Sequence, residues 1–297
     1  MTGKRKGIHL ILFFCIFIFI SCNPNSSENI TDSNAGYVLE ELFELPYEVY
    51  ESSGIITFDS IIWTFNDSGN DPVLFGLDTK TGGVVKTLLV NGAENVDWED
   101  ITQDTDFIYI GDFGNNNGTR DDLCIYKVPK SLLNDSAYQE TDSEKIRFIY
   151  EDQSEFSPGF GNTAYDCEAM IFDGDSLVLF TKDWATGRSS VYKLPRVPGS
   201  YKAGKYFELD TDGLITGADF SVQENLLVLC GYADVAPLVI KIKSFRYARS
   251  ADMEIRRIVL EDDPGIQFEG IAFFGEQILL SSENNLIVQT LYKFIIQ

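Results

Sequence analysis

The chain has 297 residues, with 46 acidic side chains against 23 lysines and arginines and a formal net charge of −23. A chain this negative repels the phosphate backbone of nucleic acids and the headgroups of anionic lipids, which argues against both as its main partner. The single histidine, His9, lies in a segment that we expect to be removed. Histidine-based triads, histidine general bases and histidine-ligated zinc sites are therefore excluded from the mature protein.

Residues 1–21 have the pattern of an export signal. Lys4, Arg5 and Lys6 precede an apolar run of about a dozen residues, which is too short for an ordinary transmembrane helix. The run ends in Phe-Ile-Ser-Cys, and the small residue directly before Cys22 resembles the lipobox of bacterial lipoproteins. The resemblance implies a lipid on Cys22, which would attach the protein to a membrane of the bacterial cell envelope, and we expect the outer membrane. An ordinary secretory signal with an incidental cysteine is the alternative.

Residues 22–36 are polar and have no apolar periodicity, which predicts a flexible tether. Short runs of apolar, β-branched and aromatic residues then recur along residues 37–297, separated by clusters of Gly, Asn and Asp. No long segment has a helical period, so the pattern predicts an all-β domain. Cys124, Cys167 and Cys230 are odd in number, and we expect buried free thiols rather than a disulfide framework.

One sequence unit recurs five times along this domain. Each copy consists of a strand, a polar turn, a more apolar strand and a polar loop, and the copies lie roughly 50 residues apart, a spacing typical of β-propeller blades. The copies begin at Ser53, Glu99, Glu168, Thr216 and Glu269. We expect a single propeller of five blades, closed by a strand from residues 37–45. Six blades, with a further unit in residues 125–165, is the alternative.

Propeller geometry brings two sets of polar residues to one mouth of the central channel. The first strand of each blade lines the channel, so the residues that begin the five units form an inner ring, with Ser53 and Thr216 as its hydroxyl members. The loops between second and third strands return to the same rim. Three carboxylates so close together need protons or a cation, and calcium prefers carboxylate, amide and water oxygens. The alternative is that Glu99, Glu168 and Glu269 bind backbone N–H groups of neighbouring blades and only hold the ring together.

The order of the blade starts, SGI, EDI, EAM, TGA and EGI, together with the loops NDSGN and GDFGNN, resembles the SdiA-regulated propeller family. It is more distantly similar to the regucalcin, gluconolactonase and phytase-like propellers. The resemblance implies a divalent cation, often calcium, in the central channel. By position it implies Glu99, Glu168 and Glu269 as carboxylate ligands, with Asp112 and Asn115 as further oxygen donors.

The rim loops supply candidates for ligand binding. Lys182 and Arg120 are cations in an acidic region and suit an anionic group, although either side chain can equally pair with a neighbouring aspartate. Trp184 offers a flat face for stacking, and packing between blades is its alternative role. The complete set of expected ligand-binding residues is Asn66, Asp67, Asn116, Arg120, Lys182, Trp184, Glu283 and Asn284.

Three functions fit these residues. The first is a lipid-anchored, calcium-binding propeller that binds a ligand or partner at its acidic mouth without catalysis. The second is a calcium-dependent hydrolase of a lactone or phosphate ester, in which Glu168 or Asp183 activates water. The third is a structural subunit of an envelope assembly.

Overall fold

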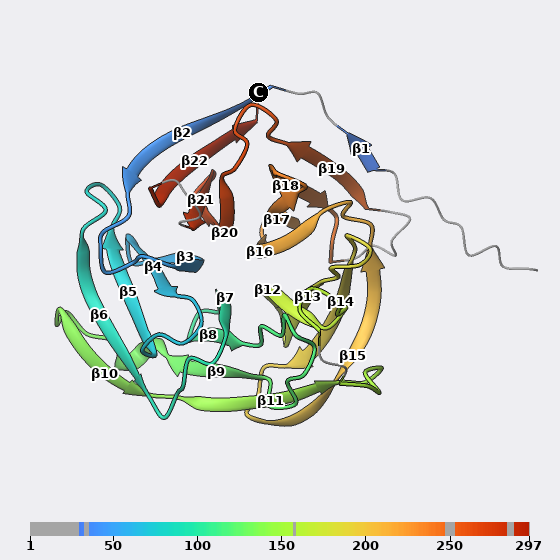
Figure 1. Ribbon diagram of the computed structural model, residues 1–297. Coiled ribbons are helices and arrows are strands. Elements are labelled where there is room, and N and C mark those ends of the chain that lie inside the picture. Colours follow the sequence, from blue (N-terminus) through green and yellow to red (C-terminus); the bar gives the residue numbers. More distant parts are fainter. Residues whose placement is uncertain (1–29, 33–35, 157–158, 247–252, 284–287, 297) are drawn as a thin grey trace, which may run out of the picture.

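The computed structural model describes residues 30–32, 36–156, 159–246, 253–283 and 288–296. The predicted lipidation site Cys22 and the predicted ligand residue Asn284 lie outside these residues. The described residues form strands, with one short 3-10 helix at Lys130–Leu132, arranged around a central axis (Figure 1). The described part of the chain contains no helix that is long and apolar enough to cross a membrane.

Each blade is an antiparallel sheet of four strands, numbered here along the chain. Blade 1 contains β3 (Ser52–Phe58), β4 (Ile61–Asn66), β5 (Val73–Asp78) and β6 (Val84–Asn91). Blade 2 contains β7 (Trp98–Gln103), β8 (Phe107–Asp112), β9 (Cys124–Pro129) and β11 (Glu144–Tyr150). Blade 3 contains β12 (Asp166–Asp173), β13 (Ser176–Lys182), β14 (Ser189–Pro195) and β15 (Gly199–Leu209).

Blade 4 contains β16 (Leu214–Ser221), β17 (Leu226–Ala233), β18 (Ala236–Lys243) and β19 (Glu254–Val259). Blade 5 contains β20 (Gln267–Phe274), β21 (Gln277–Glu283) and β22 (Thr290–Ile296), and its outer strand is β2 (Tyr37–Glu44). The N-terminal strand therefore completes the last blade and closes the ring. This confirms the predicted all-β propeller and its closure by residues near the start of the domain.

The blades are held together by apolar side chains between them. Each of the five interfaces between neighbouring blades contains one cluster of buried hydrophobic residues, and the innermost strands β3, β7, β12, β16 and β20 follow one another around the axis. Cys124, Cys167 and Cys230 are buried as free thiols, as predicted. Burial of these apolar faces is the main term that favours the closed ring.

Three extra pairings cover the outer edges of the blades. Strand β10 (Tyr138–Asp142) pairs in parallel with β6, and β11 pairs in parallel with β15, so that blades 2 and 3 share one eight-stranded sheet. Strand β1 (Ile30–Asp32) pairs in parallel with β19. Residues 125–165, which the six-blade alternative assigned to a further unit, supply β9, β10 and β11. Covered edges leave fewer unpaired N–H and C=O groups for association with other chains.

Candidate functional site

The inner-ring residues lie at a repeated break in strand pairing. In every blade the register between the first and second strands shifts near the start of the inner strand, at Ser53, Glu99, Glu168, Thr216 and Glu269 or directly beside them. Such a β-bulge leaves one residue out of the ladder and redirects its side chain. The predicted ring is therefore built from bulged residues.

A pocket of about 170 Å³ lies at the mouth of the channel, and these bulges supply part of its wall. Four inner-ring residues line it, namely Ser53, Glu99, Glu168 and Glu269. Five predicted ligand residues line it as well, namely Asp67, Asn116, Lys182, Trp184 and Glu283, together with Ser52, Phe160, Tyr232 and Gln267. The structure thus gathers most of the predicted site residues in one place.

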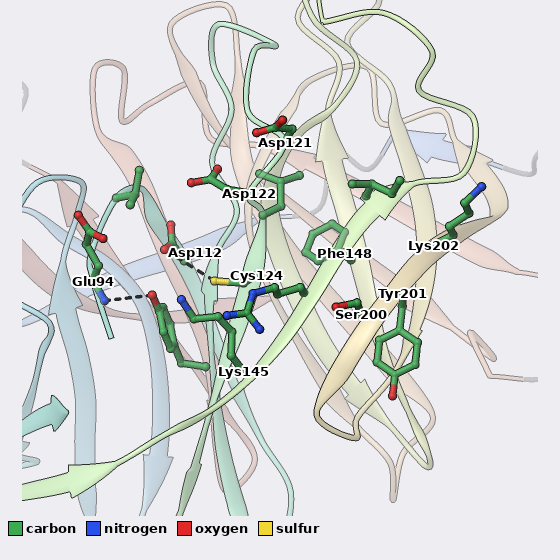
Figure 2. Close-up of a pocket in the computed structure, with 15 residues that line it drawn as sticks. Glu94, Asp112, Asp121, Asp122, Cys124, Lys145, Phe148, Ser200, Tyr201 and Lys202 are labelled. Atoms are coloured by element: carbon green, nitrogen blue, oxygen red, sulfur yellow. Dashed lines mark hydrogen bonds between the residues drawn. The ribbon is translucent and has the colours of Figure 1, made fainter. Parts of the chain in front are cut away.

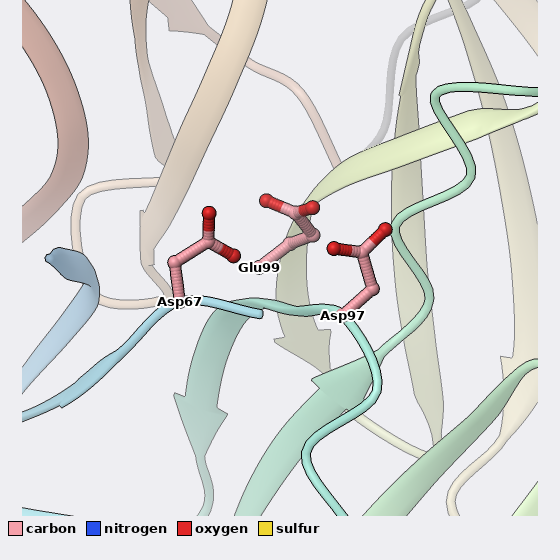
Figure 3. Close-up of side chains that lie close together, drawn as sticks. All are labelled: Asp67, Asp97 and Glu99. Atoms are coloured by element: carbon pink, nitrogen blue, oxygen red, sulfur yellow. The ribbon is translucent and has the colours of Figure 1, made fainter. Parts of the chain in front are cut away.

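Three carboxylates converge on one side of this mouth, and we call Asp67, Asp97 and Glu99 the carboxylate triad (Figure 3). One oxygen from each lies within 4.8 Å of the others. Burial, followed by the negative charge of Asp67, raises the pKa of Asp97 to about 7. Burial, followed by the charge of Glu168, raises the pKa of Glu99 well above its ordinary value. Without a cation, Asp97 and Glu99 therefore keep their protons at pH values where free carboxyl groups are ionised.

Two further observations describe the surroundings of these carboxylates. Asp67 Oδ1 is buried and has no hydrogen-bond partner among the described residues. Gly114 faces the triad, and a Cβ at this position would lie 2.1 Å from Glu99 Oε1 and 2.4 Å from Asp97 Oδ2. The lack of a side chain at this position therefore lets the two carboxylates lie close to the backbone. An oxygen-only donor set with free lone pairs suits Ca²⁺.

The mouth also contains a positive charge, beside Glu168. Lys182 Nζ lies 3.3 Å from Glu168 Oε2 and 4.6 Å from the centre of the Trp184 ring. Burial alone lowers the pKa of Lys182, but Glu168 and then Glu269 outweigh it, so the pKa lies well above its ordinary value. Burial raises the pKa of Glu269 to about 8, although Lys182 opposes this. Lys182 thus forms an ion pair with Glu168, whereas no carboxylate of the triad has an ion pair among the described residues.

Other predicted residues hold loops in place. Arg120 binds Asp112 at 3.0 Å, Asp122 at 2.9 Å and the Gly114 carbonyl at 2.9 Å. Asn115 Oδ1 accepts a hydrogen bond from the Arg120 N–H. Asp112 also accepts the N–H of Asp97. The predicted metal donors Asp112 and Asn115 therefore stand behind the triad and fix the loop that carries Gly114.

Asn66, Asp183 and the two hydroxyl members of the ring also have structural partners. Asn66 binds the backbone of Glu48 and Glu51, and Asp183 accepts hydrogen bonds within its own turn. Ser53 donates to the Glu99 carbonyl and Thr216 to the Phe268 carbonyl, each across a blade interface. These contacts position neighbouring strands.

Sequence reasoning missed Asp97 and Asn95. Asn95 donates to the carbonyls of Asn66 and Asp67 and accepts the Trp98 N–H, so it joins the rim loop of blade 1 to the start of β7. Asp97 stands two positions before Glu99. The available signal was the segment Asn-Val-Asp-Trp-Glu-Asp, which places several oxygen donors directly before an inner strand.

No protein-family model matches the sequence, and comparison with curated proteins finds no match. Among solved structures, the chain is similar to the PQQ-bound aldose sugar dehydrogenase of Streptomyces coelicolor, with a TM-score of 0.51 and 10% identity over 89% of this chain and 99% of the other. A putative glucose dehydrogenase of Thermus thermophilus aligns with a TM-score of 0.48 and 9% identity over 88% and 100% of the two chains. The first similarity shows a shared fold, and it agrees with the strand order in placing this chain among the β-propellers.

Proposed function

We propose that this protein is a calcium-binding β-propeller, lipid-anchored in the bacterial cell envelope, that binds a ligand or partner at its acidic mouth. The observation that carries the proposal is the carboxylate triad, which combines three converging carboxylates, an unpartnered buried oxygen of Asp67 and the close approach of Glu99 and Asp97 to Gly114. Like charges in a desolvated site repel strongly, and a divalent cation removes that repulsion.

The triad favours calcium over softer metals. Its donors are carboxylate oxygens, whereas zinc and copper sites in proteins usually contain imidazole or thiolate ligands. Three protein carboxylates leave several of the six to eight coordination positions of Ca²⁺ for other oxygens. An ion held by the triad would therefore have positions left for water or for oxygens of a ligand.

The rim around the triad supports ligand binding rather than packing alone. Phe160 is 74% exposed, and its ring centre lies 5.7 Å from that of Trp184. Trp184 is oriented by a hydrogen bond of 2.7 Å from its indole N–H to Asp166. A fixed, partly exposed aromatic pair beside a charged pocket is a suitable contact surface for a ligand or a partner protein.

The proposed localisation of the protein rests on its sequence. The lipobox-like segment before Cys22 supports a lipid anchor in the cell envelope, with the outer membrane as the proposed membrane. The blade-start motifs support kinship with the SdiA-regulated propellers, and the propeller fold is compatible with that kinship.

Calcium titration of the purified protein tests the proposal. We expect heat of binding by calorimetry, and a rise of roughly 5–10 °C in the thermal midpoint when free calcium is about 100-fold above its Kd. The double variant Asp97→Asn/Glu99→Gln is expected to lose both signals. Asp183→Asn is the matched control, because it removes a rim carboxylate outside the triad and is expected to keep them. Unchanged calcium binding by the double variant, or none by the wild type, would refute the site.

A further inference from the structure

Two cavities of the described surface differ in the balance of their charges. The larger cavity, of about 520 Å³, lies over β9, β11 and β15, and four acidic residues and three cations line it. Figure 2 shows Lys145 near Glu94 and Asp112, with Lys202 apart from them, so charges of both signs are mixed there. Among the described residues, five carboxylates and one cation, Lys182, line the mouth pocket. The mouth therefore favours positively charged ligands, whereas the net charge of the larger cavity favours neither sign.

Glu99 is one of the carboxylates of the mouth and has no partner. It is 6% exposed, and its carboxylate forms no hydrogen bond or ion pair with another described residue. It lines the pocket, and Figure 3 shows its carboxylate between those of Asp67 and Asp97. A buried carboxylate without a partner is unfavourable, so the pocket is built to receive a positive charge.

Calcium at the triad would not balance all the charges of the mouth. One Ca²⁺ ion and Lys182 carry three positive charges, whereas five carboxylates line the pocket. The carboxylates that remain include Glu269 and Glu283. Burial and then the charge of Glu283 raise the pKa of Glu269 to about 8, even though Lys182 lowers it. This side of the pocket is therefore short of positive charge although Lys182 is present.

The chain already places one ammonium group in this pocket, and its contacts show how such a charge is held. Lys182 Nζ lies 3.3 Å from Glu168 Oε2, 4.6 Å from the centre of the Trp184 ring and 5.4 Å from that of Tyr232. Carboxylates and the faces of aromatic rings both attract ammonium groups. Phe160 extends this aromatic wall, because its ring centre lies 5.7 Å from that of Trp184 and the residue is 74% exposed. Phe160 is thus available to contact a second ammonium group or the methylene groups beside it.

We propose that the ligand of the mouth is a free aliphatic amine with two or more ammonium groups. Its ammonium groups pair with carboxylates on the side of Glu269 and Glu283, and its methylene chain covers Phe160. The inference rests on the proposed function, since it names the ligand of the same acidic mouth. A second metal ion would balance the charges but would leave the ring of Phe160 without a contact, and an acidic ligand would add to the repulsion.

Two probes of similar length separate the charge of the ligand from its shape. Calorimetry in excess calcium is expected to show binding of 1,5-diaminopentane and none of 1,5-pentanediol at the same concentration. Glu283→Gln is expected to weaken diaminopentane binding about tenfold, and Phe160→Ala about fivefold. Neither residue belongs to the carboxylate triad, so both variants are expected to bind calcium as the wild type does, which also shows that they are folded.

Each variant has a matched control outside the pocket. Phe156→Ala removes a ring that is 42% exposed from the same loop, and Asp183→Asn removes a rim carboxylate; neither residue lines the pocket. Both controls are expected to bind diaminopentane as the wild type does. Equal losses in the variants and their controls would overturn the assignment of the amine to this pocket. Equal binding of the diamine and the diol would overturn the role of charge and with it the proposal.

The failure of this inference is distinguishable from the failure of the calcium site. A wild type that binds calcium but not diaminopentane would overturn the amine proposal alone, whereas one that binds diaminopentane but no calcium would overturn the calcium site alone. A lysine side chain of a partner protein offers similar chemistry, and N-acetyl-lysine N′-methylamide is its probe. Tighter binding of this blocked lysine than of diaminopentane would assign the mouth to a partner protein and overturn the free amine.

Discussion

The Asp97 carboxyl group keeps its proton to higher pH in the folded chain than in the unfolded chain. Its folded pKa is about 7 and its ordinary value is 3.8, mainly because of burial and Asp67. The folded state then binds the extra proton, so the associated stability is present at low pH and is lost as the pH rises through 7. Glu269, with a pKa of about 8, acts in the same direction.

In chelator, the free energy of unfolding is therefore expected to fall between about pH 4 and pH 8, from the ordinary pKa of Asp97 to the raised pKa of Glu269, with a contribution of up to about 4 kcal/mol from Asp97. Calcium should remove most of this fall, because it replaces the proton, and its affinity should rise with pH through about 7. Urea unfolding at several pH values, with and without calcium, measures both effects. Asp97→Asn should flatten the profile in chelator, and a wild-type profile that is already flat would contradict the shifted pKa.

Gly114 is the residue whose lack of a side chain lets Glu99 and Asp97 lie close to the backbone. Its backbone conformation is accessible to alanine, so Gly114→Ala acts through the added Cβ rather than through strain. That Cβ would overlap Glu99 and Asp97 and push the carboxylates apart. We expect calcium affinity to fall by at least about tenfold, measured by calorimetry.

Gly159→Ala is the control for this prediction, because a Cβ there would meet nothing closer than 3.7 Å. It is expected to bind calcium as the wild type does. Equal affinity of Gly114→Ala and Gly159→Ala would show that calcium binding does not depend on where Gly114 lets Glu99 and Asp97 lie.

At the scale of the strand, two adjacent acidic residues of β7 have different roles: one faces the mouth, and the other binds the backbone of a neighbouring blade. Glu99 stands at the bulge and faces the mouth, whereas Asp100 is buried and accepts hydrogen bonds from Met170 N at 2.7 Å and Ile101 N at 2.8 Å. Asp219 of β16 repeats the arrangement toward Phe273 of β20. The inner-strand carboxylates that bind backbone groups of neighbouring blades are therefore aspartates, one to three positions beyond the ring.

This division predicts opposite effects of neighbouring substitutions. Asp100→Ala leaves two buried N–H groups without an acceptor and is expected to cost about 2–4 kcal/mol. Asp100→Asn keeps an acceptor oxygen and should cost less. Glu99→Gln relieves repulsion in the triad and should leave stability in chelator equal or higher. Urea unfolding in chelator ranks the three variants by their free energy of unfolding. A larger loss of stability for Glu99→Gln than for Asp100→Ala would contradict the roles given to Glu99 and Asp100.

The strand pattern could be predicted from the sequence because alternation and turn residues are local properties of each blade. The repeat also identified Glu99, Glu168 and Glu269 as neighbours, since equivalent positions in a propeller face one axis. The bulges could not be predicted, because an extra residue in a strand has no fixed residue type. Asp97 was missed for a related reason. The sequence comparison took one ring position from each blade, whereas the bulge at Glu99 brings a second carboxylate of the same segment to the mouth. Asp112 forms an ion pair with Arg120. This pairing could not be predicted from the sequence, because it depends on the conformation of the loop that carries Arg120.

At the scale of the whole molecule, strand β2 closes the ring by joining the start of the domain to its end. Leu39 packs on the apolar cluster between blades 4 and 5, while its neighbour Val38 points outward and is 38% exposed. Leu39→Asp is therefore expected to cost about 2–3 kcal/mol, since it places a charge against apolar side chains. Val38→Asp on the same strand should change stability by less than about 0.5 kcal/mol. Equal losses in urea unfolding would mean that β2 contributes no specific packing to closure.

The position of the propeller relative to the membrane depends on the segment before β2. Strand β1 lies inside the predicted tether and pairs with β19 of blade 4, with Ile30 opposite Ile255. Residues 23–29 then separate the propeller from Cys22, and seven residues span at most about 25 Å. A lipid on Cys22 would therefore hold the edge of blade 4 near the bilayer. A tether that extended to residue 36 would be longer and would let the domain move farther from the membrane.

Cys22→Ser tests this attachment directly. Serine has no thiol to accept the lipid, so the variant is expected to move from the membrane fraction to the soluble fraction of the envelope or to remain unprocessed. Cys15→Ser makes the same chemical change seven residues earlier, within the apolar run, and is expected to stay with the membrane. Fractionation and intact-mass measurement of the purified proteins distinguish the outcomes. Wild-type membrane association of a processed Cys22→Ser protein would show that another part of the molecule makes the attachment, and the acidic surface of the propeller makes direct adsorption to anionic lipid unfavourable.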